Sequence, residues 1–205
     1  MKVMYNGRLI VVEGVPCAGK TTLVRNLSRF GYFIVPEISE MLCEGDSFPG
    51  DGNDYESIKK IAKWFLGKDI ERSSKARKFL SEGRDVVMDR YFVTSLAYNT
   101  AYEIYRGIPS AEELNREIYD SLSRGLLINP NLYIYLRLHP DEMRRRLKNR
   151  RDRPPSILPD FWQKNEFILP FIQFYEDFFA NLNVKIIDAT KTPEEILYEC
   201  LGFLG

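Results

Sequence analysis

The sequence predicts a three-layer α/β fold built on a five-stranded parallel sheet. Apolar runs alternate with segments of helical periodicity along the whole chain. The runs are apolar throughout their length, as parallel strands covered on both faces are. The first run also leads through a glycine-rich loop directly into a helical segment. Sheets of this kind bind ligands at the carboxyl ends of their strands.

Five apolar runs are the predicted strands, and each is bounded by a turn or a change to helical periodicity. Their carboxyl ends carry Gly14, Glu37, Asp89 and Arg137. Four chemically useful positions would therefore meet at one edge of the sheet. The predicted strands cover residues 8–13, 32–35, 85–89, 132–136 and 184–187.

Helical segments fill the chain between the strands. Ser110 with Glu113, and Thr192 with Glu195, have the spacing of capping boxes, and Pro193 suits the first helical position. The first helix is expected to end at Gly31. The predicted helices cover residues 20–30, 55–80, 92–106, 110–124, 140 to 153, and 160–181, with a last helix from 193.

Three features interrupt this pattern. Residues 44–54 are rich in glycine and acids and are predicted to be a loop. Gly67 either breaks or weakens the long helix. Pro170 is expected to kink the helix over 160–181.

Composition limits the classes of function. Residues 1–205 are expected to form a single domain, and 29 basic residues balance 29 acidic ones, so no overall charge favours nucleic acid or a membrane. Three scattered cysteines without metal-ligand spacing fit a reducing compartment, and we expect a cytoplasmic protein. Glu13 and the glycine loop interrupt the first apolar run, which therefore predicts neither a signal peptide nor a membrane span.

Residues 14–21 read G-x-x-x-x-G-K-T, the phosphate-binding loop, in its confirming context between strand and helix. Glycines let the backbone wrap a phosphate, and N–H groups at the helix N-terminus point at it. Lys20 would reach the β- and γ-phosphates of ATP, and the Thr21 hydroxyl would bind Mg²⁺. The predicted nucleotide-binding residues are Gly14, Ala18, Gly19, Lys20, Thr21 and Thr22.

Asp89 and Arg90 follow the third predicted strand. A carboxylate at the end of an apolar strand, in a protein with a phosphate loop, is placed to hold Mg²⁺ directly or through water. Arg90 could hold the group that accepts the phosphate. Taken alone, the pair could equally be a surface turn.

The residues from Asp89 to Asn99, DRYFVTSLAYN, resemble the D-R-Y-x-x-S-S-L-A-Y-Q segment of thymidylate kinases. With the phosphate loop, the resemblance implies the superfamily of thymidylate and deoxynucleoside kinases, which are P-loop kinases. It implies that Asp89 serves Mg²⁺ and Arg90 serves the acceptor. Tyr91 or Tyr98 would then line the acceptor pocket.

Residues 144–153 contain seven arginines or lysines and resemble the arginine-rich helical lid of these kinases, here about residues 140–158. Phosphoryl transfer spreads negative charge over the γ-phosphate oxygens, which an arginine can stabilise. Arg146 and Arg150 are one helical turn apart and share a face. Which arginine acts is left open. A solvated basic helix or a nucleic-acid patch is the alternative interpretation.

Two departures from the thymidylate kinase pattern leave the acceptor open. Those kinases have Arg-Glu-Pro after the second strand, whereas this chain has Val35, Pro36 and Glu37. Pro16 stands where they usually have an acid. Deoxynucleoside kinases place a glutamate after the second strand as general base, because a hydroxyl must lose a proton to attack. Glu37 is therefore either a base or a solvated loop carboxylate.

Several aromatic and charged residues have two interpretations. Phe65 and Trp64 fall near where thymidylate kinases stack the acceptor base, although at least one of them is expected in the core. Arg72 could reach the site or be solvated, and His139 is expected to be solvated. A further set recurs at helical spacing and is predicted to be core: Phe167, Phe171, Phe174, Tyr175 and Phe178.

The leading hypothesis is an ATP- and Mg²⁺-dependent kinase of a nucleoside monophosphate, resembling thymidylate kinase. The first alternative is a nucleoside kinase with Glu37 as general base. A second, from another class, is a nucleotide-dependent regulatory ATPase. The expected partner is a small nucleoside or nucleotide, with neither a membrane nor nucleic acid, and a homodimer is a candidate assembly.

Overall fold

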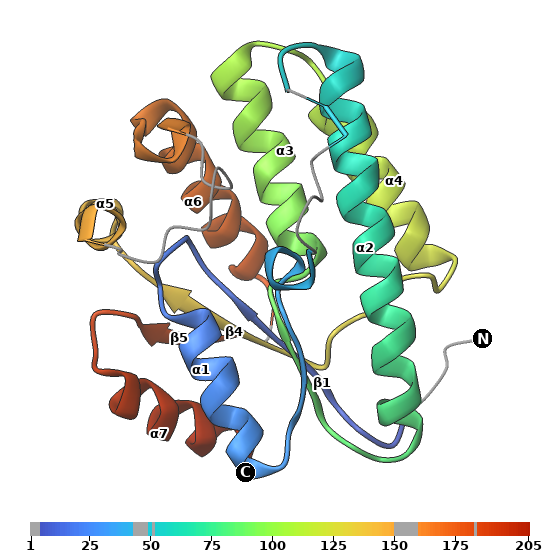
Figure 1. Cartoon of the computed structure of the whole chain (residues 1–205), viewed down its shortest axis with the longest axis vertical. Helices are drawn as coiled ribbons and strands as arrows, with labels where there is room; N and C mark the ends of the chain where they lie inside the picture. Colours follow the sequence, from blue (N-terminus) through green and yellow to red (C-terminus); the bar gives the residue numbers. More distant parts are fainter. Residues whose placement is uncertain (1–4, 43–48, 51, 150–159, 183) are drawn as a thin grey trace.

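Five parallel strands form one sheet in the order β2-β3-β1-β4-β5, which confirms the predicted fold class. The computed structural model describes residues 5–42, 49–50, 52–149, 160–182 and 184–205 (Figure 1). The strands are β1 (Leu9–Glu13), β2 (Phe33–Val35), β3 (Val86–Asp89), β4 (Leu132–Arg137) and β5 (Val184–Asp188).

β1 is the central strand, and every one of its residues is buried. It pairs with β3 on one side and with β4 on the other, in a register that places Val12 opposite both Asp89 and Ile134. All of β3 is buried as well, whereas the edge strand β5 is partly exposed. The unbroken apolar runs at the centre of the sheet therefore reflect cover on both faces.

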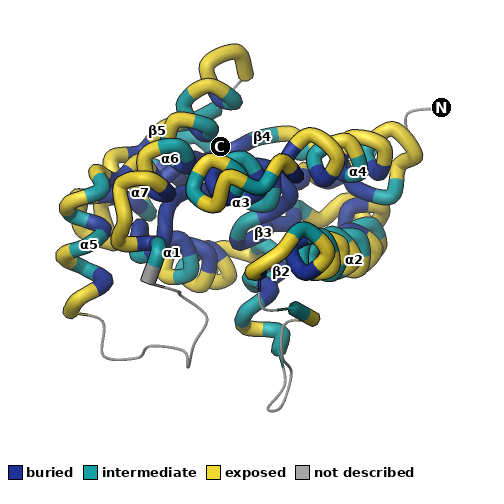
Figure 2. The backbone as a smooth tube through the Cα atoms, turned by 90° about the horizontal axis from the view of Figure 1, so that it is seen from above, coloured by how far each residue is buried: buried dark blue, intermediate teal, exposed yellow. Residues whose placement is uncertain are grey.

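The helices pack on both sides of this sheet (Figure 1). α1 contacts α7, and α3 contacts α6 and α4, while α2 packs against α3, α4, β2 and β3. In the tube view of Figure 2 the buried segments gather at the centre of the molecule and exposed ones lie outside. The helices are α1 (Lys20–Leu27), α2 (Tyr55–Ser81), α3 (Phe92–Arg106), α4 (Ala111–Ser123), α5 (Pro140–Asn149), α6 (Asn165–Phe179) and α7 (Pro193–Leu204).

Two helix predictions need correction. The first helix is α-helical only to Leu27 and continues as a 3₁₀ turn, η1 (Ser28–Phe30). The helix predicted over 160–181 is divided into a 3₁₀ turn, η3 (Asp160–Gln163), and α6, because Lys164 between them has an extended backbone. α6 continues on both sides of Pro170.

The long helix α2 runs through Gly67 without a break. Gly67 is exposed, and nothing lies within 4 Å of where its Cβ would be. Packing of the rest of α2 therefore outweighs the low helix propensity of one glycine. The predicted loop 44–54 lies partly outside the described residues, and a 3₁₀ turn, η2 (Ile38–Met41), precedes it.

One of the two capping boxes forms. Thr192 Oγ1 accepts the Glu195 N–H at 3.3 Å, and the Glu195 carboxylate accepts the Thr192 N–H at 2.8 Å. The box predicted at Ser110 is wrong. The carboxylate of Glu103 accepts the N–H groups of Ser110 and Ala111 instead, at 2.7 and 2.6 Å.

Glu113, the other half of the predicted box, is engaged elsewhere. Its carboxylate accepts from Tyr55 Oη and lies 2.5 Å from Lys59 Nζ, so it joins α4 to α2.

None of the helices in the described part of the chain has the length and apolar character that crossing a membrane requires.

Replacing Thr192 and replacing Ser110, the two residues of the predicted capping boxes, should have different effects on stability. Thr192→Ala removes a formed cap, so we expect the free energy of unfolding to fall by about 1 kcal/mol. Ser110→Ala is the matched control, since Ser110 Oγ is buried without a hydrogen-bond partner among the described residues. We expect that variant to be as stable as the wild type or slightly more stable. Urea unfolding measures both, and equal losses would contradict the assignment of the caps.

Candidate active site at the carboxyl ends of the strands

The loop of residues 14–19 connects β1 to α1 and has the backbone of a phosphate cradle. Gly14 has φ 146°, and a Cβ there would lie 2.6 Å from the Leu136 carbonyl oxygen. Gly19 has φ 96° and has open space where its Cβ would be. No described side chain caps α1, so the N–H groups of its first turn can receive an anion.

Lys20 begins α1 and lies inside this loop. Its Nζ donates to the Val15 carbonyl at 2.8 Å, and its side chain is buried. Burial lowers the pKa of the Lys20 ammonium to about 8, and the nearby Arg90 charge acts in the same direction. A bound polyphosphate would favour the charged form of this lysine.

Thr21 and Asp89 meet beside the loop and fit a Mg²⁺ ion. Thr21 Oγ1 donates to Asp89 Oδ2 at 2.7 Å. The other oxygen, Asp89 Oδ1, is buried and has no hydrogen-bond partner among the described residues. Burial raises the pKa of the Asp89 carboxyl. A hard cation would supply the missing partner, because carboxylate and hydroxyl oxygens are ligands that Mg²⁺ takes.

The surroundings of Thr21 and Asp89 would suit a cation that phosphate oxygens of a substrate also coordinate. Among the described residues, no three His, Cys, Asp or Glu side chains gather into a metal-binding group. Mg²⁺ is usually held by one or two carboxylates together with water and substrate phosphates. The Thr21–Asp89 pair at the mouth of the phosphate loop fits that type of site.

Arg90 lies between the phosphate loop and Glu37. Its Nη1 donates to the Gly14 carbonyl at 3.0 Å, and its Nε lies 3.1 Å from Glu37 Oε1. The Nε contact has the distance of an ion pair but not the direction of a hydrogen bond. Although burial opposes the charge, the Glu37 carboxylate raises the pKa of the Arg90 guanidinium above its ordinary value.

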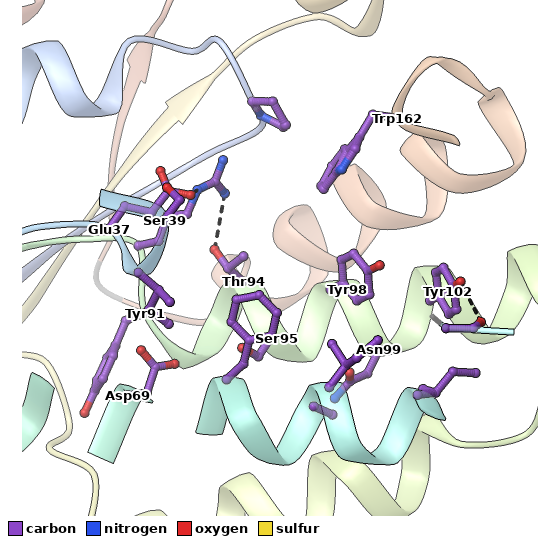
Figure 3. A pocket seen from close by; sticks show the side chains of 18 of the residues that line it. Glu37, Ser39, Asp69, Tyr91, Thr94, Ser95, Tyr98, Asn99, Tyr102 and Trp162 are labelled. Carbon is purple, nitrogen blue, oxygen red and sulfur yellow. Dashed lines mark hydrogen bonds and ion pairs between the residues drawn. The ribbon is translucent and has the colours of Figure 1, made fainter. Parts of the chain in front are cut away.

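A cavity of ≈ 260 Å³ opens beside Arg90 (Figure 3). Every residue that the sequence predicted for the acceptor lines it: Glu37, Phe65, Arg90, Tyr91 and Tyr98. Three segments far apart in the chain thus meet, around η2, in α2 and at the start of α3. Trp64 is not among the lining residues, and its ring packs edge-on against Phe65.

The hydroxyl of Tyr91 serves the core rather than the cavity. Its Oη hydrogen-bonds Ser73 Oγ and accepts the Ile128 N–H at 3.0 Å. The other tyrosine of the predicted pair, Tyr98, lies along the cavity wall in Figure 3. Of the two, Tyr98 is therefore better placed to contact a ligand.

α5 brings one arginine of the predicted lid to the phosphate loop. Arg146 donates to the Cys17 carbonyl at 3.3 Å and to the Ala189 carbonyl at 2.8 Å, and its Nε lies 2.7 Å from Glu142. Arg145 is exposed and pairs with Glu142. Hydrogen bonds from Arg145 and Arg146 lower the pKa of the Glu142 carboxyl to about 2. Arg150 and the rest of the predicted lid, residues 150–158, lie outside the described residues.

One buried charged residue of the site, Glu13, was missed by sequence reasoning. Glu13 is 0% exposed and accepts from the Tyr91 N–H at 2.9 Å, from Thr94 Oγ1 at 2.7 Å and from Tyr175 Oη at 2.9 Å. Burial raises the pKa of its carboxyl to about 7. An acid at the end of an apolar strand was the available signal, and the same signal identified Asp89.

Arg72 had been left as either a site residue or a solvated one, and the structure shows it buried. Its Nη1 lies 2.7 Å from Asp69 Oδ1, while its Nη2 donates to the carbonyls of Asp89 and Arg90 at 2.7 and 2.9 Å. The three-residue spacing from Asp69 was a weak signal for this pair.

Other lining residues carried no signal in the sequence. Phe161 and Trp162, in the turn that follows the undescribed segment, face Tyr98 and complete an aromatic wall of the cavity. Tyr175 is buried in the core as predicted, yet its hydroxyl bonds Glu13. His139 is 73% exposed, as expected.

The chain is similar to known proteins over most of its length. A family model described as an AAA domain matches residues 9–173. A thymidylate kinase of Campylobacter hominis is 30% identical over 156 residues, which are 69% of this chain and 72% of that protein. A probable thymidylate kinase of Picrophilus torridus is 27% identical over 183 residues, 88% of this chain and 86% of that protein.

Solved structures show the same fold at lower identity. Deoxyadenosine kinase from M. mycoides, with dCMP and dCDP bound, superposes with a TM-score of 0.72 at 17% identity, covering 96% of this chain and 98% of that one. Thymidylate kinase from Candida albicans gives a TM-score of 0.71 at 17% identity, covering 98% and 92%.

The raised pKa of Glu13 predicts a pH dependence of stability. Its folded pKa of about 7 lies above the ordinary 4.5, so the folded protein binds more protons than the unfolded chain between these values. The free energy of unfolding should therefore fall as pH rises through this window, by a few kcal/mol at most. The Glu13→Gln variant lacks the titrating carboxyl and is the reference for the pH dependence. Urea titrations from about pH 5 to about pH 8 should show the wild type losing stability relative to the variant; a constant or growing advantage would contradict this.

Proposed function

The chain belongs to the AAA-domain family and to the superfamily of thymidylate and deoxynucleoside P-loop kinases, and we propose that it transfers the γ-phosphoryl group of ATP to a nucleoside monophosphate. One observation carries the proposal. The phosphate loop, the Thr21–Asp89 pair and Arg90 meet beside a cavity that Pro16 of the loop and Arg90 both line. A donor site and an acceptor site therefore share a wall.

The donor half consists of the loop and the start of α1. The N–H groups of the first turn of α1 and Lys20 would bind the phosphates of ATP. Thr21 and Asp89 would hold Mg²⁺, which when bound neutralises charge on the phosphate oxygens. Arg146, which already contacts the loop through the Cys17 carbonyl, would stabilise charge from the lid side.

The acceptor half is the cavity. Arg90 would hold the acceptor phosphate, because a guanidinium binds a phosphate through two parallel hydrogen bonds. The aromatic wall that includes Phe65, Tyr98 and Trp162 would receive the base. Positioning the two phosphates in line is then the main requirement, since phosphoryl transfer asks for placement and charge stabilisation more than for covalent chemistry.

Replacing Lys20 tests the donor half. Lys20→Ala removes the cation nearest the predicted β- and γ-phosphates, so we expect kcat to fall by about 10²–10³. Lys59→Ala is the control, because that lysine pairs with Glu113 of α4 and is not among the residues that line the cavity. Steady-state rates and circular dichroism measure turnover and folding. An unchanged rate for Lys20→Ala would rule out the assignment of the loop.

A second candidate is a nucleoside acceptor with Glu37 as general base. The observation that favours it is the Arg90–Glu37 ion pair at the cavity. Among the residues that the structure describes, the charged ones that line the cavity are two acids and two arginines, Glu37, Asp69, Arg72 and Arg90. A nucleoside hydroxyl needs a base, whereas a monophosphate needs additional positive charge.

Glu37→Gln distinguishes the two acceptors. If a nucleoside is phosphorylated, loss of the base should lower kcat by about 10²–10⁴. If a monophosphate is phosphorylated, kcat should change by less than about threefold, since no proton must be removed. Glu40→Gln, three residues later and paired with Arg25, is the matched control.

The acceptor itself comes from a screen of nucleosides and nucleoside monophosphates with ATP and Mg²⁺, with products detected by mass. Phosphorylation of a monophosphate supports the leading proposal, and phosphorylation of a nucleoside alone supports the second candidate. ATP hydrolysis that no acceptor stimulates would contradict both and indicate a regulatory ATPase.

A further inference from the structure

The turn of residues 89–91 holds two of the side chains on which the proposed reaction depends, Asp89 and Arg90, and its backbone is strained. Arg90 has φ 59°, in the left-handed region that a non-glycine residue rarely adopts. Such a conformation costs roughly 1–3 kcal/mol and persists only where the surroundings hold it. Asp89 and Arg90 would therefore move if those surroundings were weakened.

The carbonyls of this turn are held from α2. Arg72 Nη2 donates to the Asp89 carbonyl at 2.7 Å and to the Arg90 carbonyl at 2.9 Å. Its other amino group, Nη1, is fixed by Asp69 Oδ1 at 2.7 Å, and both side chains are almost fully buried. One guanidinium thus spans two successive peptide groups.

The N–H groups of the same turn are held from β1. The Arg90 N–H donates to the Val12 carbonyl at 2.9 Å, which continues the pairing of β3 with β1. The next N–H, that of Tyr91, donates to Glu13 Oε1 at 2.9 Å. The second oxygen of Glu13 is fixed by the hydroxyls of Thr94 and Tyr175.

We propose that Glu13 and Arg72 form a backbone clamp that holds Arg90 in its left-handed conformation and so positions Asp89 for the cation and Arg90 for the acceptor. Both are positioning residues that act through the peptide groups of the turn. Glu13 is fully buried and is not among the residues that line the cavity. The inference rests on the proposed function for its kinetic consequences, although the clamp itself is a property of the backbone.

The oxygen that accepts from Tyr91 N–H is the essential part of Glu13. A protonated carboxyl or an amide also presents a carbonyl oxygen of the same reach. Glu13→Gln should therefore keep the clamp, whereas Glu13→Met, of similar length but without this acceptor, should open it. These two variants separate the hydrogen bond from the bulk of the side chain.

The kinetic test compares Glu13→Met with Glu13→Gln. We expect kcat to fall by about 10–100-fold for the methionine variant, as when a residue that holds a metal ligand in place is lost, and by less than about threefold for glutamine. The affinity for ATP without Mg²⁺, which reports the phosphate loop alone, should stay the same in both. Equal losses in the two variants, unchanged kcat in the methionine variant, or weakened metal-free ATP binding would each overturn the clamp.

A backbone measurement keeps the test independent of the proposed function. Hydrogen exchange of the peptide that contains the Tyr91 amide should be slow in the wild type and in Glu13→Gln, and at least about tenfold faster in Glu13→Met. If no acceptor is ever phosphorylated, the proposed function fails while this result still decides the clamp. Slow exchange in the methionine variant would overturn the clamp even if kcat had fallen.

Arg72→Lys tests the hydrogen bonds to the two carbonyls of the turn. It also replaces Glu13→Met as the test of the clamp if that variant does not fold. A single ammonium keeps the charge beside Asp69 but cannot match the forked contacts to two carbonyls. We expect a similar fall in kcat and faster exchange at the turn. The double variant Glu13→Met, Arg72→Lys should lose less than the product of the two single losses, because both act on one turn. Fully multiplicative losses would overturn their joint action.

Discussion

The pairing of β1 with β3 is the constraint on which the site depends. Its register places Val12 opposite Asp89, so the two strands end together at the same edge of the sheet. The phosphate loop and the turn at Arg90 therefore leave the sheet side by side, and Arg90 reaches the Gly14 carbonyl at 3.0 Å. A slip of one residue would turn every side chain of β3 to the other face. The phosphate loop and the turn at Arg90 are thus joined by backbone hydrogen bonds rather than by flexible surface contacts.

Burial then sets the electrostatics of the site. It raises the pKa values of the Glu13, Asp69 and Asp89 carboxyls and lowers that of the Lys20 ammonium. A buried charge is tolerated only with partners, which Glu13 finds in three donors and Asp69 in Arg72. A cation beside Asp89 and phosphates beside Lys20 would each favour the ionised form of their neighbour. The proposed ligand, a magnesium-bound polyphosphate, would therefore offset the effect of burial on both groups.

Short sequence patterns predicted the helix caps and helix ends that depend on neighbouring residues. They failed where a residue distant in the sequence takes part. The capping box at Thr192 forms because its two partners are three residues apart and each accepts the N–H group of the other. The identical spacing at Ser110 fails because Glu103, from the preceding helix, takes the N–H groups first. The helix expected over 160–181 divides at the extended backbone of Lys164, for which the apolar periodicity held no indication.

The sequence by itself determined the strands, the phosphate loop and the positions of Asp89 and Arg90, since each depends on a short run of residues. The common edge of parallel strands also placed Glu37 near that loop, whereas Phe65 and Tyr98 were expected at the acceptor pocket only from the resemblance to thymidylate kinases. Only the tertiary structure decided the roles of Glu13 and Arg72. Their partners in the turn lie 78 and 17 residues away. A buried arginine and a solvated one look the same in sequence, because periodicity does not say which strand end a helix face will meet.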